Sequence, residues 1–455
     1  MRKVLFFLII SVFGLIALPA QDNPLLWRGS IETDQRLLLE KENDWAWNEN
    51  RLDLQLEKRV RPVRIVGNVW LRHLGPSITE SSADLFYKDK INPWNLDVRE
   101  AYVEVYGFIS DKLDLKAGRQ QFAWGTADRF NPTDNLNPPD LEDIFDFGRV
   151  SGSDAVSLQW HFSHSTSLQG VFMPFFRPAN MPLGIYADLM TIPLDLPPGF
   201  SMRHYNDTLQ MPRNNLNEGV TAGARLRSFV LNTDFSVSYI YGRDPLPVPD
   251  LARLSLTDSP GKLDVAARLI YPRHHIIGAD MSGSIGRVGI WAEAALFIPE
   301  EEIVMKIHTP PAEDLPLPLP PVIKQTMLKK KAYTKFILGA DYTFRNQTYL
   351  NIQYLHGFLH ESGDGNLNDY LFVQTERNFL QNTLRVQPLA GGLSIADRDE
   401  PDKNYALFYT PEVSYIGIDN LEVTVGGYFF TGKGDNLFAG LKERNMIRLA
   451  VKGSF

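Results

Sequence analysis

The chain has 455 residues, a net charge of −8, 44% hydrophobic residues and a mean hydropathy of −0.20. It is too polar for a bundle of transmembrane helices and too apolar for a disordered protein, and its acidic balance gives no support for nucleic-acid binding. The absence of cysteine excludes a disulfide framework, a thiolate metal site and a cysteine nucleophile.

The first predicted element is a secretory signal peptide over residues 1–20. Arg2 and Lys3 give a positive start, residues 4–18 form an apolar core, and Ala20 ends a typical cleavage site. The alternative is a membrane anchor, but the apolar run is shorter than the roughly 20 residues that a spanning helix needs. We therefore expect export of a mature chain that begins near Gln21.

After the signal peptide, the dominant pattern is strict alternation of apolar and polar side chains, which is the period of a β-strand. Phe336, Leu338 and Ala340 share one face of such a segment, and Lys335 and Asp341 lie on the other. The same pattern returns in segments along the whole chain, whereas helical periodicity is weak. The sequence therefore predicts an all-β protein.

The connections between these segments alternate between minimal turns and long links. The long links comprise residues 41–50, 75–96, 126–152, 177–216, 244–273, 298–332, 360–403 and 432–441. A soluble sandwich has no reason to sort its loops in this way, whereas outer-membrane barrels have short periplasmic turns and long external loops. We predict one transmembrane, antiparallel, up-and-down β-barrel domain over residues 21–455, with about 16 strands (roughly 14–18). The segments near 29–39 and 263–272 are the least defined strands.

The densest motif lies in "LKAGRQQFAWGTADRFNPTDNLNPPDLEDIFDFGR" (residues 115–149). It resembles a porin-like family of Gram-negative outer-membrane barrels, in which a strand carrying GRQ and WG runs into a loop carrying NP. The residues that match are Gly118, Arg119, Gln120, Trp124, Gly125, Asn131 and Pro132. The resemblance implies a porin-like channel and does not indicate its solute.

In this arrangement residues 126–152 form the third external loop. In general porins of about 16 strands the third loop folds into the lumen, and by that analogy this loop is a candidate constriction. The alternative is an ordinary surface loop. The predicted acidic side of the constriction comprises Asp128, Asp134, Asp140, Glu142, Asp143 and Asp146.

Wall arginines would form the basic side of this constriction, and the candidates are Arg72, Arg119, Arg225 and Arg227. Opposed charges across a narrow gap would screen solutes by size and charge. The alternative is a salt-bridge network that stiffens the wall. The register of Arg119 is the least certain, because Gly118 and Gly125 favour bulges.

No enzyme is expected. The chain has no G-x-S-x-G elbow, no Ser–His pairing at matched strand positions and no histidine pair on a helical face, so we predict no catalytic residue, metal or cofactor.

The chain ends in the alternating strand "NMIRLAVKGSF". Closing a barrel requires the last strand to pair with the first, since hydrocarbon offers no partner to an open edge. The strand also resembles the signal read by the outer-membrane barrel-assembly machinery, with Val451, Gly453 and Phe455 at the matching positions.

The sequence thus favours a passive outer-membrane channel for a small solute. The alternatives are a channel for hydrophobic molecules resembling fatty-acid transporters, and a surface or assembly barrel that transports nothing. The expected partners are outer-membrane lipid, the barrel-assembly machinery and a small-molecule solute, without nucleic acid. The resemblance also allows a homotrimer, because porins are often trimers.

Overall fold

The computed structural model describes residues 24–40, 44–79, 81–190, 196, 199–259, 261–311, 320–434 and 436–455. The predicted signal peptide lies outside these ranges. None of the helices within them is long and apolar enough to cross a membrane.

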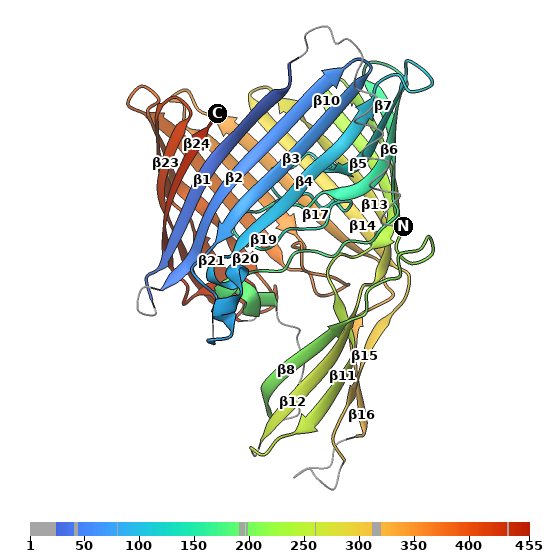
Figure 1. Ribbon diagram of the computed structural model, residues 1–455, viewed down its shortest axis with the longest axis vertical. Helices are drawn as coiled ribbons and strands as arrows, with labels where there is room; N and C mark the ends of the chain where they lie inside the picture. Colours follow the sequence, from blue (N-terminus) through green and yellow to red (C-terminus); the bar gives the residue numbers. More distant parts are fainter. Residues whose placement is uncertain are drawn as a thin grey trace.

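Nineteen strands form one closed antiparallel sheet (Figure 1). The strands of its first half are β1 (Leu26–Leu38), β2 (Trp45–Val60), β3 (Val63–Leu74), β4 (Trp94–Val105), β5 (Leu113–Gln120), β6 (Ser153–His161), β7 (Thr166–Met173), β9 (Thr221–Val230) and β10 (Thr233–Arg243). The strands of its second half are β13 (Arg273–Ile285), β14 (Val288–Pro299), β17 (Tyr333–Thr343), β18 (Tyr349–His356), β19 (Asp369–Phe379), β20 (Leu384–Ile395), β21 (Tyr405–Tyr409), β22 (Glu412–Ile418), β23 (Leu421–Lys433) and β24 (Met446–Ser454).

The wall of this barrel has 18 strand positions, because β21 and β22 are two halves of one position. Both halves pair with β20 on one side and β23 on the other. The predicted antiparallel barrel is therefore confirmed, with one hairpin more than the expected 16 strands. That hairpin is β19–β20, and it lies inside residues 360–403, which the alternation pattern assigns to a single loop.

A second sheet of five strands lies outside the barrel, at the end opposite the C-terminus (Figure 1). Its order is β16-β15-β11-β12-β8, and its strands are β8 (Ser201–Leu209), β11 (Val248–Leu256), β12 (Lys262–Ile270), β15 (Ile303–His308) and β16 (Val322–Leu328). The expectation of plain loops at 177–216, 244–273 and 298–332 is thus wrong for these strands. Likewise, residues 263–272 contribute β12 here and not a wall strand.

This outer sheet has its own small apolar core. Ala252, Leu263, Met305 and Ile307 are almost completely buried, and they come from three different strands. The alternate residues of β12, such as Arg268, point away from that core and are exposed. Burial of one face explains why three separate connections gather into one sheet.

Helical structure is minor. The short helices are η1 (Asp84–Phe86), α2 (Lys88–Ile91), η2 (Gly184–Met190) and η4 (Ala439–Leu441). All of them lie in long connections, so they do not interrupt the wall.

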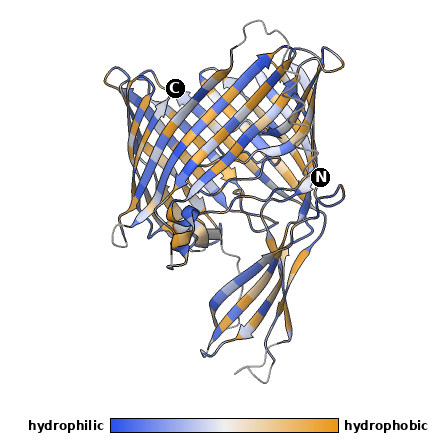
Figure 2. Cartoon of the chain, in the orientation of Figure 1, coloured by the Kyte–Doolittle hydropathy of each residue, from blue (hydrophilic) through white to orange (hydrophobic). Residues whose placement is uncertain are grey.

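The two faces of the wall differ in composition as the alternation predicts, with apolar and polar residues taking turns along each strand (Figure 2). On β17 the outward-facing Leu338 is 53% exposed, while Ile337 is fully buried in the barrel. On β24 the outward-facing Leu449 is 48% exposed, and the adjacent inward-facing Ala450 is buried. An apolar outer surface of this extent suits hydrocarbon and not water.

The barrel closes where β1 pairs with β24. The backbone amide of Gly29 donates to the Phe455 carbonyl at 2.9 Å, and the Phe455 amide donates back at 2.9 Å. The Phe455 ring also packs against Trp27, with ring centroids 5.4 Å apart. The terminal aromatic residue is therefore part of the closure itself.

Arginine at Leu338 should destabilise the barrel by about 2–4 kcal/mol when it is embedded in lipid, because the side chain would face hydrocarbon. The matched variant is Gln374→Arg, at an inward residue that lines a polar cavity and has access to water. Urea unfolding of both variants in lipid vesicles measures the difference. Equal losses would show that the assignment of the two faces is wrong.

Valine at Gly29 should impair closure. A Cβ there would lie 2.3 Å from the Asp53 carbonyl oxygen and 2.8 Å from Cζ of Phe455. The control is Gly67→Val, at a wall glycine where an added Cβ would meet no atom within 4 Å. Folded yield, read as the heat-modifiable band on gels, should fall for Gly29→Val and stay near normal for Gly67→Val. The same yield for both would argue against the tight packing at the closure.

Candidate functional site

The connection between β5 and β6, residues 121–152, crosses the interior of the barrel, and we call it the lumen loop. It contacts inward side chains of β1, β3 and β4 on one part of the wall. It also contacts β14, β19 and β23 on the other part. Because these strands lie around much of the barrel circumference, the loop occupies the lumen.

The sequence motif explains how the chain leaves the wall. Trp124 is buried, and its Nε1 donates to Oε1 of Gln169 at 2.9 Å. Gly125 follows with φ of 115°, a conformation that glycine adopts without strain. A Cβ at Gly125 would lie 2.8 Å from Oε1 of Glu293, so only glycine permits this approach. The WG pair therefore fixes Trp124 in the lumen and turns the backbone toward β14.

The other motif residues support the same departure from the wall. Gln120 is buried, and its Nε2 donates to the Ala155 carbonyl at 3.0 Å while its Oε1 accepts from Ser157 at 3.0 Å. Asn137 closes the first part of the loop by accepting from the Phe122 amide at 3.0 Å. Asn131 and Pro132 lie within this part, where Asn135 donates to the Pro132 carbonyl at 2.7 Å.

Glu293, on β14, is the main anchor of the lumen loop. Its carboxylate accepts hydrogen bonds from the backbone amides of Thr126 and Ala127, and from the Thr133 hydroxyl at 2.9 Å. Glu293 is only 2% exposed. Hydrogen bonds from backbone amides to a charged acceptor are among the stronger ones, so this residue holds the start of the loop.

The second half of the loop is held by ion pairs with wall arginines. Asp143 pairs with Arg36 of β1 at 2.6 Å, and Asp140 pairs with Arg99 of β4 at 2.8 Å. Glu142 pairs with Arg72 of β3. All six residues except Glu142 are nearly inaccessible to solvent, so these pairs are desolvated in contrast to surface salt bridges.

Arg149, which belongs to the loop itself, connects two of these ion pairs. It pairs with Asp140 and Glu142, each at 2.7 Å. The guanidinium groups of Arg99 and Arg149 lie over the Trp70 ring, at 4.1 Å and 5.4 Å from its centroid. Aromatic stacking and ion pairing thus act on the same arginines.

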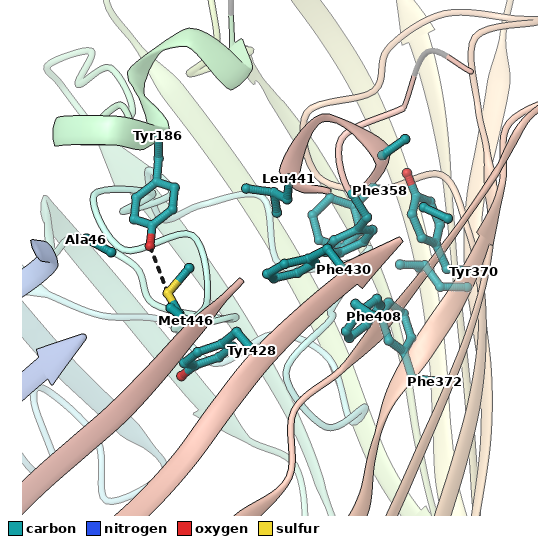
Figure 3. Packing of buried hydrophobic residues seen from close by; sticks show 14 of the residues in the cluster. Ala46, Tyr186, Phe358, Tyr370, Phe372, Phe408, Tyr428, Phe430, Leu441 and Met446 are labelled. Atoms are coloured by element: carbon teal, nitrogen blue, oxygen red, sulfur yellow. Dashed lines mark hydrogen bonds between the residues drawn. The ribbon is translucent and has the colours of Figure 1, made fainter. Parts of the chain in front are cut away.

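An aromatic cluster packs against the loop near the long-connection end of the barrel (Figure 3). Phe145 of the loop stacks on Tyr428 with ring centroids 4.4 Å apart, and Phe130 stacks on Phe372 at 4.5 Å. Tyr186, from η2, reaches in from another connection and donates to Sδ of Met446 at 3.3 Å. These contacts close much of the lumen on that side.

One cavity of about 210 Å³ is lined by the start of the loop, Gln121 to Trp124, and two further cavities flank its later part. The inner cavity has a volume of about 450 Å³ and is lined mainly by charged and amide side chains of the wall. The outer cavity, of about 160 Å³, is lined mainly by apolar and aromatic side chains. The residues that line both are Arg129, Phe130, Asp143, Asp146 and Phe147. A few side chains of one loop therefore separate the two cavities.

The predicted basic residues divide into two groups. Arg72 pairs with Glu142, and Arg225 donates to the Ala123 carbonyl at the start of the loop at 3.0 Å. Arg227 pairs instead with Asp234 on the neighbouring strand, and it lines a cavity together with the first residues of the loop. Arg119 pairs with Asp154, and its register partner is the exposed Ala101, so it lies on the outward side of the wall. The register of β5 is unbroken on both sides, so Gly118 causes no bulge, and Arg119 shares the outward face of its strand with Leu115 and Ala117.

The predicted acidic residues also differ in environment. Asp140, Glu142 and Asp143 contact arginines directly, without a gap between the two signs of charge. Asp146 lies 3.9 Å from Arg149, and Asp128 lines the inner cavity. Asp134 accepts from Asn137 at 3.1 Å, away from these pairs.

Sequence reasoning missed Arg36, Arg99, Arg149 and Glu293. Arg36 and Glu293 lie on the polar side of alternating strands, which is the only sequence signal for them. Arg99 has the parity of the apolar Ala101 and Val103, and it faces the lumen because the register shifts between β3 and β4 at this point. That signal is shared by many lumen residues, so the contact with the loop could be found only from the register of the strands.

The pKa values of the loop carboxyls Asp143 and Asp134 are shifted in opposite directions. Burial disfavours ionisation of Asp143, but the charge and hydrogen bonds of Arg36 outweigh it and lower the pKa of Asp143 to about 2. Asp134 retains some accessible surface but lies deep inside the barrel, and this burial raises its pKa to about 8, assisted by the charge of Glu293. Asp134 is therefore largely protonated near neutral pH.

The raised pKa of Asp134 predicts a pH dependence of stability. The folded state binds its proton more tightly than the unfolded state, so stability should fall as pH rises from about 4 to about 8. Asp134→Asn should remove this fall and raise the melting temperature at pH 8 more than at pH 5. Scanning calorimetry at both pH values tests this. An unchanged pH dependence in the variant would mean that Asp134 is already ionised at neutral pH.

Removing the Glu293 carboxylate should release the start of the lumen loop. Glu293→Ala leaves the Thr126 and Ala127 amides without their acceptor, which should weaken loop docking by about 2–4 kcal/mol. Glu293→Gln keeps an oxygen acceptor and should have a smaller effect. Hydrogen exchange of residues 121–137 measures both variants. Unchanged protection in Glu293→Ala would show that other contacts hold the loop.

Solved structures that are similar to this chain include three outer-membrane barrels. The structure of Acinetobacter baumannii OccAB4 is 9% identical, with a TM-score of 0.50, and the match covers 96% of this chain and 100% of that one. Acinetobacter baumannii OccAB3 is 9% identical, with a TM-score of 0.49, covering 94% and 98%. Salmonella typhi OmpF, in a complex with daunomycin, is 10% identical, with a TM-score of 0.42, covering 95% and 98%. At these identities the likeness concerns the porin-like barrel fold alone.

No curated protein sequence matches the chain. A family model described as "Protein of unknown function (DUF1302)" matches residues 74–301. This region spans half of the chain and includes the GRQ, WG and NP elements, the whole lumen loop and its anchor Glu293. The chain therefore belongs to the family described as "Protein of unknown function (DUF1302)".

Proposed function

We propose that this protein is a porin-like channel of the Gram-negative outer membrane that lets a small solute pass through its lumen. The observation that carries the proposal is the pair of cavities on either side of the lumen loop. The loop narrows the barrel interior, and side chains rather than a folded plug domain separate the two cavities.

The wall supports placement in a membrane. Its outward face exposes large apolar side chains on strand after strand, whereas charged residues such as Arg36 and Glu293 face the lumen. Such a surface would cause aggregation in water but is stable in lipid. The outer membrane is the proposed location because closed barrels with short turns at one end and long connections at the other occur there.

The proposed pathway runs from the outer cavity, past the lumen loop, into the inner cavity. Phe130 and Phe147 line both cavities, and their ring centroids are 5.1 Å apart. The inner cavity is lined by Arg36, Arg51 and Arg448 together with several carboxylates, which suits passage of a hydrated polar group. The two phenyl rings are therefore the narrow step of the proposed route.

A barrel that transports nothing is the competing function. The direct ion pairs between loop carboxylates and wall arginines favour it, because they resemble struts more than the two sides of an open gap. The two functions differ in one measurable property, which is ion conductance across a lipid bilayer.

The purified barrel should form channels in planar lipid bilayers. Phe130→Ala should raise the single-channel conductance, because it shortens a side chain between the two cavities. The control is Phe235→Ala, at an outward-facing phenylalanine of β10 that is 45% exposed. This control should leave conductance unchanged.

A folded wild-type protein without conductance would contradict the channel proposal and favour the closed barrel. If the wild-type protein conducts and Phe130→Ala has the same conductance, Phe130 does not form the narrowest part of the pathway. Heat-modifiable mobility of each preparation shows beforehand that the barrel has folded.

A further inference from the structure

The outer cavity has an unusual combination of linings. Its walls are mainly apolar and aromatic, and the residues concerned are Phe130, Phe147, Ile276, Phe297, Leu355 and Phe358. Basic side chains line the same space, and two of them, His274 and Lys335, come from the wall strands that carry Ile276 and Phe336 and flank Phe297. Apolar walls with a few convergent polar groups are typical of small-molecule sites.

Lys335 is a buried cation without a salt bridge among the described residues, and the carboxylates that act on it electrostatically are those of Asp244 and Glu361. It is 7% exposed, and its Nζ donates to the carbonyls of Phe358 at 2.9 Å and Leu359 at 3.2 Å. None of the carboxylates in the described ranges forms a salt bridge with it. An ammonium group has three donors, and a buried charge is costly unless it is paired. Lys335 therefore has capacity for one anionic acceptor.

His274 supplies a second unused polar atom. It is 1% exposed, and its Nε2 has no hydrogen-bond partner among the described residues. Its ring packs edge-on against Phe297, with centroids 6.1 Å apart, and Lys335 Nζ lies 5.3 Å from the same Phe297 ring. The two basic groups thus flank one phenyl ring, on three strands that neighbour each other in the wall.

Several other charged groups around this cavity have partners of their own. Asp140 and Asp143 pair with arginines, and Arg243 donates to the carbonyls of Glu218 and Tyr271. Asp244 accepts from the Leu246 amide at 3.0 Å and from the Ser362 hydroxyl at 3.4 Å. Asp134 is largely protonated near neutral pH, because burial raises its pKa to about 8. Arg129, Arg149 and His360 also line the cavity, and Nη1 of Arg149 is a second buried donor without a hydrogen-bond partner in the described part of the chain. Lys335 differs from them in lying beside His274 and over the Phe297 ring, among the apolar walls.

We propose that the outer cavity binds a small amphipathic monocarboxylate, whose apolar or aromatic body packs among the phenyl rings while its carboxylate accepts hydrogen bonds from Lys335 Nζ and His274 Nε2. This inference rests on the proposed channel function and specifies the solute class. A strongly hydrated inorganic anion would lose its water against apolar walls without compensation, so it fits this cavity poorly.

Calorimetric titration of the full folded barrel in detergent tests the inference with three probes. Benzoate should bind, benzamide should bind at least about tenfold more weakly, and inorganic phosphate should show no binding. Benzamide has the same shape as benzoate without the charge. Equal binding of benzoate and benzamide, or binding of phosphate as strong as that of benzoate, would overturn the proposal on the wild-type protein alone.

Variants locate the binding. Lys335→Gln should weaken benzoate binding by about tenfold or more, because it removes the charge at the site. The matched control is Lys116→Gln, at another lumen lysine, whose Nζ lies over the Tyr102 ring and which lines a separate cavity. This control should bind benzoate normally. If Lys335→Gln does not fold, His274→Phe replaces it, since phenylalanine preserves the ring packing and removes Nε2. Unchanged benzoate binding in the folded site variant would overturn the proposal.

Conductance of the same wild-type preparation separates the two proposals. A conducting barrel that does not bind benzoate would leave the channel function intact and overturn the solute class. A barrel that binds benzoate but does not conduct would support the binding site and contradict the proposed channel function.

Discussion

The rest of the structure depends on barrel closure. Every backbone amide and carbonyl of the wall must find a partner on a neighbouring strand, because a membrane offers none. The pairing of β1 with β24 supplies the partners for the first and last strands. A closed wall allows irregular backbone only at the strand ends or inside the lumen. Any segment that enters the lumen then needs partners from inward-facing side chains. Glu293 and the arginines of β1, β3 and β4 are these partners, so the position of the lumen loop follows from the register of the wall.

The same geometry shapes the electrostatics of the interior. Carboxylates of the loop lie within hydrogen-bond distance of guanidinium groups of the wall. Buried ion pairs contribute less to stability than their Coulomb energy suggests, since both partners lose their water. Their contribution here is to define one position for the loop: each carboxylate has its own arginine on a different strand. A loop shifted along the barrel would leave several buried charges unpaired.

Most of the barrel could be predicted from alternation, because one face meets an apolar medium and the other a polar lumen. The hairpin β19–β20 could not, since Tyr370, Leu371, Phe372 and Val373 are apolar on both faces where the aromatic cluster fills the lumen. The outer sheet was also hidden, because β8 is exposed along its whole length and its sequence shows no apolar alternation. In the site, Arg72 could be assigned from its parity and from the loop analogy. The roles of Arg36 and Glu293 depend on which strands lie opposite the loop, and sequence spacing does not encode that distance around the barrel.

The outer sheet combines hairpins with parallel pairs. Within it, β11 pairs in parallel with β15, and β12 pairs in parallel with β8, so each pairing joins two connections that leave the barrel at different places. Backbone hydrogen bonds and a shared apolar core, and not chain continuity alone, therefore hold these connections together. A protease that cut the tip between β11 and β12 would leave both strands clamped by their neighbours, and the two fragments would migrate as one particle until a denaturant separated them.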